Sequence, residues 1–92
     1  MKKALFTFEN LVEEGQVPAQ DCNAILFKNN CRNTTSVNTM VVNGSTLYEG
    51  DELGLSCDDN ETDTTVYNVT FSGAGSSKEY LIIRKFSSDV RK

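Results

Sequence analysis

The sequence predicts an all-β protein, a small antiparallel β-sandwich or barrel of about seven short strands in a single domain, residues 1–92. Two observations support this fold class. Apolar and polar residues alternate with period two in short segments, and clusters of Gly, Asn, Asp and Ser separate the segments about every 8–12 residues. Helical periodicity is nearly absent. One core is expected, because so short a chain cannot divide into two independent ones.

The first expected strand is 4–8, with Phe6 and Phe8 on one face and Leu5 and Thr7 on the other. Residues 9–21 contain two adjacent glutamates, a glycine and the only proline, which predicts a loop with at most one helical turn. The segment 24–28 is apolar on both faces. It therefore predicts a strand in the middle of a sheet.

A hairpin is expected next. The segment 37–42 leads into Asn43-Gly44, the pair that best supports a type I′ turn because both central residues need positive φ. The remaining turns and alternating segments predict a returning strand, a second turn and three further strands, at 46–48, 49–51, 52–57, 64–71 and 79–86.

The last expected strand is apolar on both faces. Leu81 and Ile83 lie on one side, and Tyr80, Ile82 and Phe86 lie on the other. A small sandwich covers only one face of such a strand. We therefore expect a neighbouring chain to cover the second face.

Composition argues against catalysis. The chain has no histidine, which is the commonest general base and metal ligand, and Asn, Thr and Ser make up 26 of its 92 residues. We expect no catalytic, cofactor-binding or metal-binding residues and no cofactor. The carboxylates Glu13, Glu14, Glu49 and Asp51 have no evident cleft between them. The acidic run 58–63 fits a solvated turn, with calcium binding as the open alternative.

Three cysteines, Cys22, Cys31 and Cys57, match no zinc spacing; we expect reduced, buried thiols, and one disulfide is the alternative. The apolar stretch after Lys3 is cut by Thr7 and Glu9, so no signal peptide is expected. The four Asn-x-Ser/Thr sequons then have no role in glycosylation. No segment approaches the roughly 20 apolar residues of a membrane span.

Charge is unevenly distributed. The net charge is −4, but residues 4–83 carry −9 and the two ends together carry +5. If the first and last strands are neighbours, the molecule has a basic pole, which is either a docking surface for an acidic partner or scattered solubilising charge. Nucleic-acid binding is not expected, because the acidic body repels phosphate. Without tryptophan, a glycan-binding or adhesion module is the alternative function rather than the preferred one.

The order of motifs between residues 21 and 84 resembles that of small virion proteins of tailed bacteriophages. The similarity is to auxiliary capsid, or head-decoration, proteins of crAss-like gut phages. It is carried by the segments Asn23-Ala24-Ile25-Leu26-Phe27-Lys28-Asn29, Val42-Asn43-Gly44, Leu47-Tyr48-Glu49-Gly50-Asp51, 61–71 and Tyr80-Leu81-Ile82-Ile83-Arg84. Such proteins have no catalytic residues to transfer.

The resemblance implies a non-enzymatic subunit that is made in the host cytoplasm and binds the outer surface of a phage capsid, stabilising it or supporting a fibre. Its expected partners are the major capsid protein and other virion proteins; a homo-oligomer is left open. The binding energy is expected from apolar side chains of the terminal strands, with basic side chains for charge matching. The expected interface residues are Lys2, Lys3, Phe6, Phe8, Ile82, Arg84, Lys85, Phe86 and Arg91.

Overall fold

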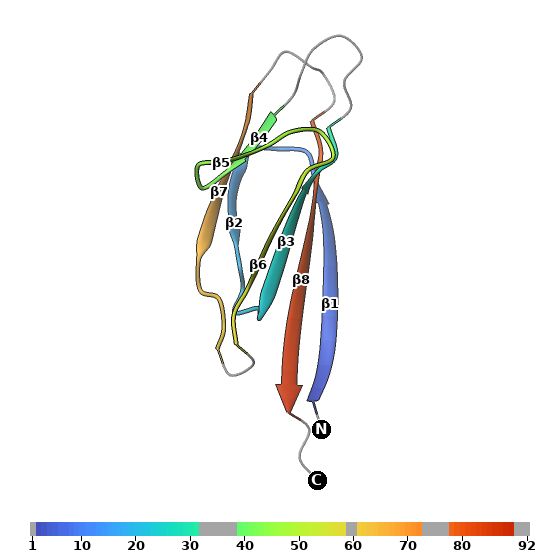
Figure 1. The fold of residues 1–92 in the computed structure, drawn as a ribbon, viewed down its shortest axis with the longest axis vertical. Helices are drawn as coiled ribbons and strands as arrows, with labels where there is room; N and C mark the ends of the chain where they lie inside the picture. The colour runs from blue at the N-terminus through green and yellow to red at the C-terminus, as the bar shows by residue number, and fades with distance from the viewer. Residues whose placement is uncertain (1, 32–38, 59–60, 73–77, 90–92) are drawn as a thin grey trace.

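The computed structural model describes residues 2–31, 39–58, 61–72 and 78–89. Strands form two four-stranded antiparallel sheets that face each other as a sandwich (Figure 1). Sheet A has the order β1-β8-β3-β6, and sheet B has the order β2-β7-β4-β5. The predicted small antiparallel β-sandwich is confirmed, with eight strands in the described residues instead of about seven.

Strand pairing joins the first and last strands of the described structure. β1 pairs with β8 along its whole length, so the first and last strands are neighbours, and β3 is central between β8 and β6 as its two apolar faces predict. The strands are β1 Lys2–Leu11, β2 Gly15–Pro18, β3 Ala24–Asn29, β4 Thr39–Val42, β5 Ser45–Leu47, β6 Glu52–Ser56, β7 Val66–Ser72 and β8 Tyr80–Asp89.

The prediction of a loop over residues 9–21 is wrong. β1 continues to Leu11, and β2 occupies Gly15–Pro18. Proline argued against a strand because it has no amide hydrogen for the ladder. β2 lies at the edge of sheet B and pairs only with β7, and at an edge the missing donor costs no ladder hydrogen bond. Val17 anchors this short strand in the core.

The core fills the space between the two sheets. Phe27 of β3 and Tyr67 of β7 meet edge to face, with ring centroids 5.1 Å apart and an interplanar angle of 64°. Cys22 and Cys31 are free, buried thiols, whereas Cys57 is half-buried. The other buried members of the main cluster are Val17, Ala19, Ile25, Met40, Val42, Leu47, Val69, Tyr80 and Ile82.

The β4–β5 hairpin turns as predicted. Val42 pairs with Ser45 across Asn43 and Gly44, whose φ angles are 47° and 88°. Positive φ strains a residue that carries a Cβ atom. The Asn43 side chain offsets part of this strain, because its Oδ1 accepts a hydrogen bond from the Asn68 amide at 2.8 Å.

Gly44→Ala is expected to destabilise the fold by about 1 kcal/mol, because alanine disfavours the left-handed conformation. Space is not the limit, since no atom lies within 4 Å of an added Cβ. Gly15→Ala is the matched control: its surroundings are equally open and its φ is not positive. Thermal melting of both variants tests this. An equal loss of stability in the two would contradict the expectation.

Candidate protein-binding face

The outer face of sheet A, away from sheet B, carries apolar side chains at the surface. Strand register sets these side chains in rows across β1, β8, β3 and β6. Phe6 and Phe8 are 52% and 64% exposed. What we call the outer face consists of two neighbouring rows, one of Phe8, Ile83, Leu26 and Gly54 and one of Phe6, Lys85, Ala24 and Ser56.

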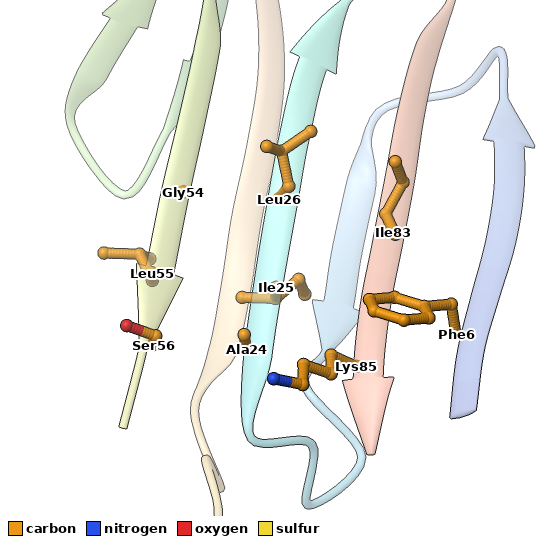
Figure 2. A pocket seen from close by; sticks show the side chains of 9 residues that line it. All are labelled: Phe6, Ala24, Ile25, Leu26, Gly54, Leu55, Ser56, Ile83 and Lys85. Carbon is orange, nitrogen blue, oxygen red and sulfur yellow. The ribbon is translucent and has the colours of Figure 1, made fainter. Parts of the chain in front are cut away.

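A shallow hollow of about 340 Å³ lies in this face (Figure 2). Its lining includes Phe6, Leu26 and Ile83, which come from three adjacent strands. On the β6 side the hollow is open, because Gly54 has no side chain. A Cβ atom added there would lie in ordinary contact, 3.9 Å from Cδ1 of Leu26. Lys85 brings an amine to the same hollow. The arrangement can receive an apolar side chain and pair a nearby carboxylate.

The end of the β1/β8 pair is also only partly covered on its inner face. β3 pairs with β8 only as far as Lys85, so the segment of β8 beyond it pairs with β1 alone. Leu5, 63% exposed, lies opposite the half-buried Phe86 on the inner face of this pair, beside a second hollow of about 380 Å³. A two-stranded ribbon is marginally stable alone in water, and this one presents the apolar side chains of Leu5 and Phe86 on its inner face.

Four predicted interface residues are available at this surface or beside it. Phe6 and Phe8 are exposed on the outer face, Lys3 is exposed on β1, and Lys85 is half-buried beside the hollow. Phe86 packs partly against the core. Lys2 pairs with Asp89 in the sheet, and Arg91 lies outside the described residues.

Two predicted interface residues are placed inside the fold, so they cannot supply a docking surface. Ile82 is a fully buried core residue. Arg84 is also buried: its Nη2 donates to the carbonyl oxygen of Pro18 at 2.8 Å, its Nε donates to the same oxygen at 3.2 Å, and its Nη1 pairs with Glu9. Arg84 therefore joins β8 and β1 of sheet A to β2 of sheet B.

The prediction of Ile82 and Arg84 as interface residues is wrong, because their face of β8 lies in the core. Both faces are apolar, so periodicity separates Ile82 from Ile83 but does not say which of them points inward. Ile83, Leu26 and Leu5 were consequently missed. A usable signal was present for Leu26, because a strand predicted as central with two apolar faces has to expose one of them in a two-layer sandwich.

A group of polar side chains, which we call the polar corner, lies between the end of β6 and the start of β7. It consists of Cys57, Asp63, Thr65 and Tyr67. The Tyr67 hydroxyl donates to Oδ2 of Asp63 at 2.5 Å, and the Thr65 amide donates to Oδ1 of Asp63 at 2.8 Å. Burial and the Asp63 hydrogen bond raise the pKa of Tyr67 to about 12. Burial opposes ionisation of Asp63, but hydrogen bonds from Thr65 and Tyr67 outweigh it and lower the pKa of that carboxyl.

The thiol in this corner is a weak nucleophile. Burial, followed by the carboxylates of Glu61, Asp63 and Asp58, raises the pKa of Cys57. Nucleophilic attack requires the thiolate, which these charges disfavour at neutral pH. The corner is therefore suited to fixing the turn between β6 and β7, with Asp63 as the shared hydrogen-bond acceptor.

Alkaline pH is expected to weaken the fold through Tyr67. Its folded pKa of about 12 lies above the ordinary value of 10.0, so the protonated phenol favours folding. This stabilisation is fully present below pH 10 and is lost as the pH rises from 10 to 12. Denaturant unfolding across this range should show the loss, and Tyr67→Phe should remove that part of the pH dependence. An identical pH profile in Tyr67→Phe would contradict this assignment.

In the described part of the chain, no three His, Cys, Asp or Glu side chains are grouped so that they could hold a metal ion. The predicted acidic run includes residues 59 and 60, which lie outside that part. No helix among the described residues is long and apolar enough to cross a membrane. The chain matches no protein-family model, and no curated protein is significantly similar to it.

Proposed function

We propose that this protein is a non-enzymatic structural subunit that binds another protein through the outer face of sheet A. The observation that carries the proposal is the pair of exposed rings of Phe6 and Phe8 beside the apolar hollow. Exposed apolar patches with polar residues at their margin are typical of protein-binding surfaces. Lys85 supplies positive charge beside the hollow of this one.

The partner we propose is the outer surface of a bacteriophage capsid, to which the chain binds as an auxiliary, or decoration, subunit. This choice rests on the resemblance of residues 21–84 to head-decoration proteins. The outer face, with Lys85 beside its hollow, suits a capsid patch with an apolar side chain beside a carboxylate. Binding there would stabilise the shell or support a fibre.

Aromatic side chains favour a protein partner over a glycan. Sugar-binding platforms usually expose flat aromatic rings with polar groups beside them, and of the three tyrosines Tyr67 and Tyr80 are buried while Tyr48 is exposed. Phe6 and Phe8 have no polar atom for a sugar hydroxyl. Burial of their rings against an apolar protein surface is therefore more favourable than contact with a sugar.

Co-sedimentation with empty capsid shells of a crAss-like phage, assembled from its major capsid protein, tests the proposal. We expect saturable binding in many copies per shell and at least a tenfold loss of affinity in Phe8→Asp, because the variant places a charge in the contact. Val66→Asp is the matched control, since Val66 is 49% exposed on β7 of sheet B.

Absence of shell binding by the unmodified chain would overturn the capsid proposal. Equal loss in the Phe8 and Val66 variants would instead reject the outer face as the contact. A melting screen against glycans gives the opposing result: ligand-dependent stabilisation of a few kcal/mol at about 100 times the dissociation constant would favour the glycan-binding alternative.

A further inference from the structure

We propose that two copies of this chain associate through the free edge of β1, so that sheet A continues as one eight-stranded sheet across a two-fold axis. The inference goes beyond the proposed function, because it concerns the chain alone and needs no capsid. Its basis is the hydrogen-bonding edge of β1 together with the charges along that strand.

β1 differs from the other edge strands of the described structure. The edges of the two sheets are β1, β6, β2 and β5. β2 has four residues and ends in Pro18, β5 has three residues, and β6 has five and contains Gly54. Short strands, proline and breaks in regularity protect edges against pairing with another chain. β1 has ten residues in unbroken register with β8 and contains neither proline nor glycine.

The backbone groups that β1 presents at this edge follow from the pairing of β8. The Glu79 carbonyl accepts from the Asn30 amide, and the Lys85 carbonyl accepts from the Asn23 amide, so odd-numbered residues of β8 face β3. Because the direction alternates along a strand, the even-numbered residues of β8 face β1. Their partners on β1 are odd-numbered. Ala4, Phe6, Phe8 and Asn10 therefore direct their amide and carbonyl groups away from the sheet.

Charge along β1 makes the strand complementary to an antiparallel copy of itself. If Phe6 of one copy lies opposite Phe6 of the other, Lys3 of each copy lies opposite Glu9 of its partner on the inner face. Neighbouring registers that also join even-numbered residues place Lys3 opposite Thr7 or Leu11. Opposite charges facing each other across strands are stabilising. The Glu9 side chain remains 43% exposed beside Arg84, so it is accessible to a second cation.

This register also brings the outer faces of the two copies together. Phe6 lies at the two-fold axis, and Ala4 of each copy lies opposite Phe8 of the other. The apolar surface becomes continuous across both copies, because even-numbered side chains stay on the outer face. A single symmetric contact thereby supplies hydrogen-bond partners for the outward-facing amide and carbonyl groups of β1, and it leaves the outer face available for a further partner.

Solution mass tests the association. We expect the purified chain to show twice its 10.2 kDa mass by light scattering over a dilution series. Phe6→Pro removes an amide hydrogen that faces the free edge but none of those that bond β8, so its mass should fall to that of one chain while the fold melts as a unit. Phe6→Val, which keeps the amide and the β-propensity, should remain a dimer. Ala4→Pro has the same edge-facing position and replaces Phe6→Pro if that variant does not fold.

Cross-linking tests the register. Under an oxidant, Phe6→Cys in a Cys57→Ser background should form a disulfide-linked dimer, because directly opposite Cα atoms lie about 5.5 Å apart. Phe8→Cys should not, since its copy is displaced by about 13 Å along the strand. A monomeric unmodified chain, or an unchanged dimer in the proline variants, overturns the proposal. Preferential cross-linking of Phe8→Cys overturns the register. Neither result bears on whether the chain binds capsids.

Discussion

Replacing Phe27 with alanine is expected to lower the free energy of unfolding by about 4 kcal/mol. Phe27 is completely buried on β3 and packs edge to face against Tyr67 of the opposite sheet. The substitution removes the transfer free energy of the ring and leaves a cavity between two sheets whose strands are held by their ladders. A domain of this size has about 5–15 kcal/mol of stability in total, so the loss is a large part of it.

Phe8→Ala is the matched control for this variant. Phe8 is also a phenylalanine on sheet A, but its side chain points outward and is largely exposed. Its removal should change stability by no more than about 0.5 kcal/mol. Urea unfolding of both variants measures the difference through the transition midpoint. Comparable midpoint shifts in the two variants would show that the outer face contributes to folding as much as the core does.

Arg84→Met is expected to cost about 3 kcal/mol, the second-largest effect. The guanidinium donates two hydrogen bonds to the Pro18 carbonyl and pairs with Glu9, so it joins three strands from both sheets. Methionine has a comparable length and apolar stem but no donor. The variant leaves the Pro18 carbonyl without these charge-assisted bonds and the Glu9 carboxylate without its partner.

Glu9→Gln should cost less, about 1 kcal/mol, because the Glu9 side chain is partly exposed and water can replace much of its interaction. In this variant Arg84 keeps both bonds to Pro18. Unfolding free energies of the two single variants separate these contributions. If Glu9→Gln were as destabilising as Arg84→Met, the stabilisation would come from the ion pair and not from the bonds that tie β8 to β2.

The aromatic and basic residues of the terminal strands therefore form two groups, one expected to affect stability and one expected to affect association. Arg84, Ile82 and the core side of β8 hold the sandwich together. Phe6 and Phe8 are exposed, and together with the outer side of β8 they are the residues that we propose for association. Variants of the first group should therefore lower stability, and variants of the second should alter binding or mass with the fold retained. Measuring stability and association on the same variants tests this separation.

Local signals determined much of the fold. Period-two alternation located seven of the eight described strands. Asn43-Gly44 specified the hairpin between β4 and β5, because positive φ at two successive positions favours these two residue types. The two apolar faces of 24–28 identified β3 as central. Each of these features depends on residues close together in the chain, which is why the sequence alone could predict them.

Contacts between distant segments decided the rest. β2 forms because Gly15–Pro18 pairs with β7 at a sheet edge, where proline is tolerated. Nothing within residues 9–21 indicates that partner. Likewise, the choice between Ile82 and Ile83 as the buried side chain depends on where sheet B packs, since either face of β8 is apolar enough to be the core. The free edge of β1 and the burial of Arg84 follow from the same packing. Sequence therefore set the alternation along each strand, and tertiary structure assigned each face and edge to the core or to the surface.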